Sequence, residues 1–289
     1  MPIFEMIGYG RGKYPDDIPI NVKEVACHFD TEFIASETEY SLHTEYSYGK
    51  RKFKNPLLQK YSKLNMNEKE IPLLWCDKEW SKEFAYFIIE MTSKSITPKY
   101  IEVHPPFSNY TRNIGEFVDR YEVFENIILN QYPNTKILIE NRSGSLYGKE
   151  FVISRSEQML ELGEIIEDRG LNLRMILDVP QIYTAHAKVT MDEQDYSEIL
   201  YSLIGIRHLI GGVHLWGKRT GSTGRWMAHK GDLNSYFRNK EEVKDKCLSA
   251  LFDLFDDGLT RNMVLEVNDK NEYLLSIIDD LMSKKFTFI

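Results

Sequence analysis

Short β-branched runs alternate with longer helical patterns between about residue 97 and residue 268 of this 289-residue chain. Such alternation, at a spacing of roughly 35 residues, is typical of βα units that build a parallel sheet. Because no linker-like break in composition interrupts the pattern, we expect a single domain over residues 1–289. The strands predicted in this region cover residues 97–104, 135–141, 173–179, 210–216 and 262–268.

The upstream part of the chain supplies further candidate strands, over residues 3–10, near 25–36 and over 40–48, which brings the total to eight. Eight such strands predict an α/β fold of the (β/α)8 TIM barrel type. The first two units are expected to be abbreviated, because residues 11–40 leave little room for full helices. A doubly wound open sheet is the alternative, but no Gly-rich turn of the dinucleotide-binding pattern follows the first strand.

Helix signals lie between the predicted strands. Residues 113–130 place apolar side chains on one face at the 3, 4, 7 spacing of an amphipathic helix. Ser154 with Glu157 has the spacing of a capping box, and Gly170 marks the end of that helix. The pairs Thr190/Glu193 and Asp269/Glu272 predict two further helix starts.

Six metal-capable side chains fall at or near the carboxyl ends of separate predicted strands. Because those ends meet at the active-site face of a TIM barrel, all six could point into one mouth. Clustered carboxylates repel one another unless cations lie between them. Three imidazoles with three carboxylates suit one or two ions such as Zn²⁺ or Mn²⁺. The six residues are His43, His104, Glu140, Asp178, His214 and Glu266.

Motifs at the ends of these strands carry a family resemblance. They resemble the successive strand-end motifs of xylose-isomerase-like TIM barrels, and LHTEY (42–46) makes the endonuclease IV type (AP endonuclease family 2) the closer match. The resemblance covers roughly residues 40–270. The other matching motifs are VHPPF (103–107), ILIENRSG (137–144), MILDVPQ (175–181), GGVHLWGKR (211–219) with AHKGDLN (228–234), and VLEVND (264–269).

The resemblance implies a ligand set. His43, His104 and Glu140 would hold one metal ion, and Glu140 would bridge to a second ion that Asp178, His214 and Glu266 complete. The family's third metal uses three positions that read Gln181, Met227 and His229 here, so two of its three ligands are missing. A third ion is therefore not expected, which speaks against orthodox AP-endonuclease activity.

Charge is distributed unevenly along the chain. The net charge of −8 hides a segment, residues 49–63, with six basic residues and no acid, and another, residues 211–240, with six basic residues and one acid. Aromatic residues are interleaved with both, as phosphate contact and base stacking require; solvated loops are the plainer interpretation. The expected substrate-binding residues are Tyr46, Gln181, Trp216, Lys218, Arg219, Arg225 and His229.

The leading functional expectation is a divalent-metal-dependent hydrolase of a phosphate-bearing small molecule or DNA, a phosphodiesterase or endonuclease IV-like enzyme with a dinuclear site. Glu140 and Glu266 are its expected catalytic residues. The second hypothesis is a sugar or sugar-phosphate isomerase or epimerase, in which Glu140, Asp178, His214 and Glu266 hold one ion. The third is a barrel that binds nucleic acid or a partner without turnover.

Three widely spaced cysteines, an odd number with no CxxC pair, argue against a disulfide framework. The N-terminus lacks a secretory pattern, and no stretch approaches the roughly 20 apolar residues of a membrane helix. We therefore expect a cytoplasmic protein without membrane contact. The sequence leaves the oligomeric state open.

Overall fold

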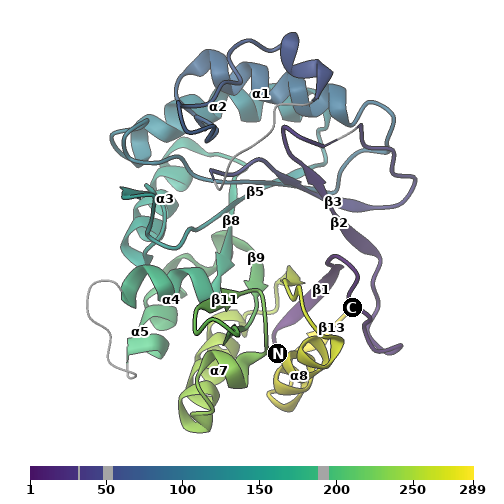
Figure 1. Ribbon diagram of the computed structural model, residues 1–289, viewed down its shortest axis with the longest axis vertical. Helices are drawn as coiled ribbons and strands as arrows, with labels where there is room; N and C mark the ends of the chain where they lie inside the picture. Colours follow the sequence, from purple (N-terminus) through teal and green to yellow (C-terminus); the bar gives the residue numbers. More distant parts are fainter. Residues whose placement is uncertain (32, 48–54, 188–194) are drawn as a thin grey trace. The chain divides into compact units, whose positions relative to one another are not determined.

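The computed structural model describes residues 1–31, 33–47, 55–187 and 195–289 (Figure 1). The chain divides into two compact units: unit 1 consists of residues 1–23 and 176–289, and unit 2 of residues 24–175. In the described ranges, no helix is both long and apolar enough to cross a membrane.

The fold is an α/β TIM barrel with eight parallel strands and flanking helices, as the sequence predicts. All eight predicted strands are present, although the second begins at Val22 rather than near residue 25. No helix occurs in the described residues of the first two connections, so these units are abbreviated as expected. The strands are β1 (Ile3–Gly8), β2 (Val22–Cys27), β3 (Tyr40–Thr44), β4 (Tyr100–Val103), β5 (Lys136–Glu140), β8 (Arg174–Asp178), β9 (Ile210–Leu215) and β12 (Thr260–Leu265).

In unit 2, the strands β3, β4 and β5 pair in parallel in chain order, with His43 opposite Glu102. Helices α1 (Lys78–Met91) and α2 (Ile114–Gln131) pack side by side, and α3 (Ser156–Arg169) contacts α2 (Figure 1). Trp75 lies in the core beneath them, with its ring centroid 5.1 Å from that of Trp80 and 5.3 Å from that of Phe124. Unit 2 also contains a short 3-10 helix, η1 (Pro56–Gln59), and a small hairpin of β6 (Ser145–Leu146) and β7 (Lys149–Glu150).

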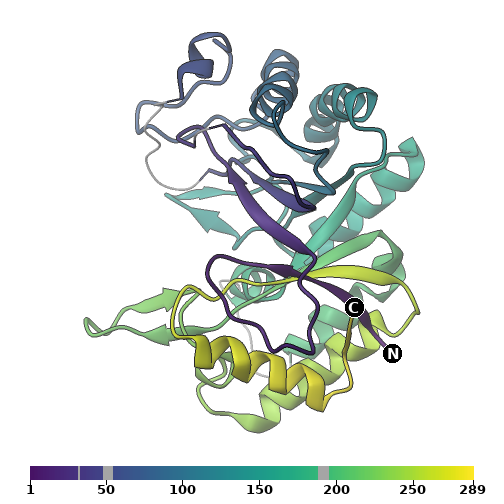
Figure 2. The same ribbon diagram turned by 90° about the vertical axis from the view of Figure 1, so that its right-hand side faces the viewer.

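In unit 1, β13 (Thr287–Phe288), β1, β12 and β9 pair in that order, all in parallel. Helix α7 (Glu241–Phe255) packs against helix α5 (Asp195–Ser202). A two-stranded antiparallel hairpin, β10–β11, follows β9 and projects from the rest of unit 1 (green in Figure 2). The remaining elements are α4 (Val179–Ala187), α5 (Asp195–Ser202), η2 (Ile204–Leu209), β10 (Lys218–Thr220), β11 (Trp226–Ala228), α6 (Leu233–Tyr236), α7 (Glu241–Phe255) and α8 (Asn271–Ser283).

Close backbone approach fixes the base of this hairpin. A side chain at Gly217 would overlap the backbone of Gly231 and Asp232, so only glycine fits there. The chain therefore leaves the barrel at Gly217 and returns beside it at Gly231.

The predicted helix signals have mixed outcomes. Helix α2 occupies the predicted region 113–130, and its N-cap is Asn113, whose side chain accepts from the backbone N–H of Glu116. Helix α3 ends at Gly170 in the left-handed conformation, as predicted. The Ser154/Glu157 capping box is wrong, because Gln158 instead accepts from the backbone N–H groups of Ser154 and Arg155.

Two predicted helix starts remain. The start at Asp269 is wrong by a short margin, since α8 begins at Asn271 with Lys270 as its N-cap. Thr190 and Glu193 lie outside the described residues.

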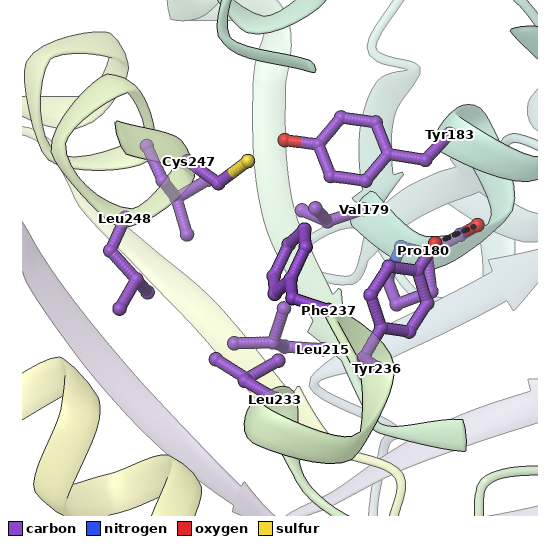
Figure 3. Close-up of a pocket in the computed structure, with 10 residues that line it drawn as sticks. Val179, Pro180, Tyr183, Leu215, Leu233, Tyr236, Phe237, Cys247 and Leu248 are labelled. Carbon is purple, nitrogen blue, oxygen red and sulfur yellow. Dashed lines mark hydrogen bonds between the residues drawn. The ribbon is translucent and has the colours of Figure 1, made fainter. Parts of the chain in front are cut away.

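A small apolar cavity lies within unit 1, between α4, α6 and α7 (Figure 3). Figure 3 shows the Tyr183 hydroxyl directed toward the Cys247 sulfur, and burial raises the pKa of both groups. No carboxylate or imidazole lines this cavity, so it belongs to the packing of unit 1 rather than to chemistry.

Candidate metal centre

In unit 2, three of the predicted metal ligands come together; they are called here the unit 2 ligand group (His43, His104 and Glu140). His43 lies on β3, His104 directly follows β4, and Glu140 ends β5. Their candidate ligand atoms all lie within 4.8 Å of one another, and all three residues are buried. Parallel pairing of neighbouring strands produces this convergence, because it aligns the carboxyl ends of the strands.

The hydrogen bonds of His104 fit a cation at this group. Its Nδ1 lies 3.2 Å from the Glu45 carbonyl oxygen, and its Nε2 lies 3.0 Å from Glu140 Oε2. Burial lowers the pKa of His104 to about 4, despite the opposing effect of Glu140, so the ring is neutral at pH 7 and carries a single N–H. One N–H cannot serve both acceptors. A divalent cation between Nε2 and the carboxylate would satisfy the second contact.

Two carboxylates that were not among the predicted site residues, Glu24 and Glu102, lie beside Nδ1 of His43. Its Nδ1 lies 3.1 Å from Glu24 Oε1 and 3.9 Å from Glu102 Oε2. Burial lowers the pKa of His43, but Glu24, Glu102 and Glu140 outweigh that effect and raise it to about 9. Strand alternation could have identified Glu102, since it precedes His104 by two residues and therefore shares its face of β4.

The carboxylates of Glu24 and Glu102 lie on the Nδ1 side of His43, which also belongs to the set of possible ligands with His104 and Glu140. Such pairs fix the ring and its tautomer at many metal sites. The Glu102 carboxylate is itself oriented by a hydrogen bond donated by the Ser41 hydroxyl. Glu24, His43 and Glu102 also lie close enough to form a second set of potential ligands, with His43 shared between the two sets.

Aromatic and cationic side chains surround the unit 2 ligand group. The ring of Tyr46, a predicted substrate-binding residue, lies 5.4 Å from that of His104 and 5.9 Å from that of His43. Arg142 donates to Glu140 Oε1 over 3.0 Å and lies 5.6 Å from the Tyr46 ring. Arg142 was not among the predicted site residues, although it lies in the same motif as Glu140, two residues further on.

The backbone of His104 is tied to the core of unit 2. The indole N–H of Trp75 donates to the His104 carbonyl oxygen over 2.7 Å, and Trp75 is itself buried among aromatic rings of α1 and α2. The position of this ligand thus depends on the packing of the helices.

The other three predicted ligands belong to unit 1 and are called here the unit 1 ligand group (Asp178, His214 and Glu266). Asp178 ends β8, His214 lies on β9, and Glu266 directly follows β12. Glu266 contacts two imidazoles, since its Oε1 lies 3.6 Å from His214 Nδ1 and its Oε2 lies 3.4 Å from His229 Nδ1. His229, predicted as a substrate-binding residue, is therefore adjacent to a candidate ligand.

Neutral donors orient Asp178. The backbone N–H and the side-chain amide of Gln181 donate to its two oxygens over 2.8 and 2.7 Å, and the indole N–H of Trp216 donates over 3.0 Å. The Trp216 ring in turn stacks on that of His229, with centroids 4.4 Å apart. Two predicted substrate-binding residues, Gln181 and Trp216, thus contact a candidate ligand directly.

The basic residues singled out in the sequence lie in two different parts of the structure. Lys218, Arg219 and Arg225 lie on the β10–β11 hairpin of unit 1 or in its turn. Of the basic segment 49–63, residues 49–54 lie outside the described part of the chain, and Lys60 pairs with Glu90 at 2.5 Å on the surface. The described part of this segment therefore favours the plainer interpretation of solvated loops.

Comparison with known proteins gives fold relatives without close sequence relatives. No protein-family model matches the chain, and no curated protein matches it. A solved structure of AsfvAP:AG has a TM-score of 0.51 at 11% identity, with 98% of this chain and 97% of that chain covered. A xylose isomerase domain protein from Planctomyces limnophilus has a TM-score of 0.50 at 11% identity, covering 98% of this chain and 95% of that chain.

At this identity the likeness concerns the fold alone. The eight parallel strands, their flanking helices and both structural neighbours lead to one conclusion: the chain has a TIM-barrel fold similar to that of AsfvAP:AG and of the xylose isomerase domain protein.

Proposed function

We propose that this protein is a divalent-metal-dependent hydrolase of a phosphate-bearing substrate, with two ions held by the unit 1 and unit 2 ligand groups. Both groups lie at the carboxyl ends of parallel strands, which is where TIM-barrel enzymes carry their chemistry. Each group combines imidazole nitrogen with carboxylate oxygen, a donor set that suits Zn²⁺ or Mn²⁺.

The observation that carries the proposal is the pair of acceptors around His104. A neutral, buried ring has one N–H for two acceptors, the Glu45 carbonyl and the Glu140 carboxylate, and a cation at Nε2 would satisfy the second contact. It also favours hydrolysis over isomerisation, because an isomerase with one ion held by Glu140, Asp178, His214 and Glu266 makes no use of His43 and His104.

The ligand residues and their neighbours have different roles in the proposed reaction. When bound, the ions supply a water of lowered pKa and neutralise charge on the phosphoryl oxygens. Glu140, held by Arg142, and Glu266, held between two imidazoles, are the proposed catalytic carboxylates, since both would lie at the ions. Tyr46 packs against the ligand rings and excludes water from that side.

Metal analysis and hydrolysis test the proposal together. The purified protein is expected to bind two equivalents of Zn²⁺ or Mn²⁺ and to hydrolyse bis(p-nitrophenyl) phosphate and DNA. Glu140→Gln, which keeps the shape and removes the charge, should lose about 1000-fold in rate. Fewer than two equivalents and no hydrolysis with either metal would reject the proposal. Unchanged binding of DNA by Glu140→Gln without any turnover in the parent would favour the non-catalytic alternative.

We also propose a cytoplasmic location, in line with the three free thiols of Cys27, Cys76 and Cys247. Labelling of all three with a thiol reagent in freshly lysed, unfolded protein is the expected result.

A further inference from the structure

The two faces of the β10–β11 hairpin differ in charge. Residues directly opposite each other in an antiparallel pair share a face, and faces alternate along a strand. The pairings Lys218 with Ala228 and Thr220 with Trp226 therefore lie on one face, and the pairing Arg219 with Met227 lies on the other. Arg219 forms an ion pair with Asp269 over 2.8 Å, so the charge of its face is neutralised.

Two cations on the Trp226 face have no such partner. Lys218 Nζ lies 4.4 Å from the centre of the Tyr236 ring and 5.6 Å from that of Trp226, while the Arg238 guanidinium lies 5.2 Å from Trp226. Among the residues that the structure describes, no carboxylate pairs with Lys218 or Arg238. Burial, followed by repulsion from Arg238, lowers the pKa of Lys218. An anion bound here would relieve that repulsion.

Trp226 differs from the other tryptophans of the chain. Its exposed fraction is 45%, against 5% or less for Trp75, Trp80 and Trp216. Arg238 reaches it from a left-handed backbone conformation just after α6, which is uncommon for a residue with a side chain. An exposed indole with two unneutralised cations beside it combines a stacking surface with phosphate-binding groups.

We propose that this face, called here the Trp226 face (Lys218, Trp226, Tyr236 and Arg238), binds single-stranded nucleic acid. One base stacks on Trp226, and a backbone phosphate contacts Lys218 and Arg238. A free sugar phosphate would use the two cations but would leave the indole exposed, so the nucleic acid accounts for more of the face. This inference rests on the proposed function and specifies its substrate, since only Leu215, Trp216 and Gly217 separate His214 from Lys218.

Binding of oligothymidylate about ten nucleotides long tests the proposal. The full-length Glu140→Gln protein serves as the parent, so that cleavage does not interfere. Tryptophan emission should fall on binding, because Trp226 is the one tryptophan exposed to the bases. Trp226→Ala should weaken binding about 10-fold, and Trp226→Phe should retain part of the affinity.

The salt dependence of oligothymidylate binding shows whether Lys218 and Arg238 contact phosphates or only stabilise the structure. Lys218→Ala and Arg238→Ala should each weaken binding and reduce the slope of log affinity against log salt by about 0.7, the value for one single-strand phosphate contact. Lys94→Ala is the matched control: Lys94 Nζ lies 5.2 Å from the ring of Phe33, which is likewise exposed, in unit 2. It should leave affinity and slope unchanged.

Two outcomes would overturn the inference. One is oligothymidylate binding by Trp226→Ala that is as tight as that of the parent. The other concerns quenching of Trp226 fluorescence by acrylamide. If ribose 5-phosphate protects Trp226 from quenching as well as oligothymidylate does at the same concentration, the face is a site for small phosphates. Failure of the proposed function looks different. In that case the Glu140→Gln protein still binds the oligonucleotide as above, while the native protein hydrolyses no phosphodiester.

Discussion

The two ligand groups use different means to hold carboxylates and imidazoles in a buried place. In unit 2, positive groups compensate the negative carboxylates. Glu24, Glu102 and Glu140 raise the pKa of His43 to about 9, and Arg142 forms an ion pair with Glu140. In unit 1, neutral donors from Gln181 and Trp216 orient Asp178. A proton therefore competes with a metal at His43.

This difference has a consequence for stability. Buried carboxylates that depend on one protonated imidazole lose their compensation when that proton leaves. Carboxylates oriented by amide and indole N–H groups do not. Unit 2 should therefore respond to pH and to metal removal more strongly than unit 1.

The largest expected effect comes from His104→Ala. It removes a proposed ligand of the unit 2 ligand group, so the protein should lose one equivalent of bound metal and about 1000-fold in the rate of phosphodiester hydrolysis. His208→Ala, in η2, is a matched control outside both ligand groups. Full metal content in His104→Ala would instead favour the isomerase hypothesis, in which Glu140 and the unit 1 ligand group hold the ion.

Metal-free protein should lose stability as the pH rises. The pKa of His43 is raised from 6.5 to about 9 on folding, so its contribution is complete below pH 6.5 and disappears as the pH passes 9. We expect the free energy of unfolding in chelator to fall by roughly 1 to 3 kcal/mol between pH 6.5 and 9. Urea unfolding at a series of pH values measures it.

Glu24→Gln provides the internal check on that result. It removes the nearest carboxylate, so the pKa of His43 should fall and the pH-dependent loss should shrink. A loss of the same size in Glu24→Gln would assign the pH dependence to other groups.

Trp216→Phe addresses the unit 1 ligand group. It removes one neutral donor from Asp178 and keeps most of the ring that stacks on His229. Loss of an orienting hydrogen bond of this kind weakens metal binding by about 10-fold. In a calorimetric titration, only the ion bound by the unit 1 ligand group should therefore bind more weakly. An equal loss of affinity for both ions would contradict the proposal that each ligand group holds its own ion.

The smallest effect is expected for Lys60→Ala. Lys60 pairs with Glu90 on the surface of unit 2, and its side chain is 62% exposed. Such pairs contribute about 0 to 1 kcal/mol, so thermal unfolding should change little and hydrolysis not at all. A large drop in hydrolysis would instead indicate that the basic segment 49–63 contacts the substrate.

The sequence predicts strands and strand-end residues well, because parallel βα repeats determine both. Each of the eight predicted strands is present, and His43, His104 and Glu140 come together as their places at strand ends require. Local capping was less predictable: Gln158, rather than Glu157, closes the start of α3, and the two residues compete through side-chain geometry that composition does not reveal.

The supporting residues were the harder part to predict. Glu24 lies on a strand whose start was misplaced, so its face could not be assigned. The roles of Gln181 and Trp216 as donors to Asp178 depend on contacts across α4 and β9, which no spacing in the sequence encodes. Arg219 was predicted to bind substrate, yet its partner, Asp269, lies 50 residues away in the chain.

The approach of Gly217 to Gly231 and Asp232 makes the hairpin a separable module. Residues 218–230 begin and end at nearly the same point, so a linker of one or two residues could replace them without stretching β9 or α6, and a shorter loop costs little entropy to close. Substrate range could thus be altered by exchanging this one segment, while the strands that carry both ligand groups keep their sequence.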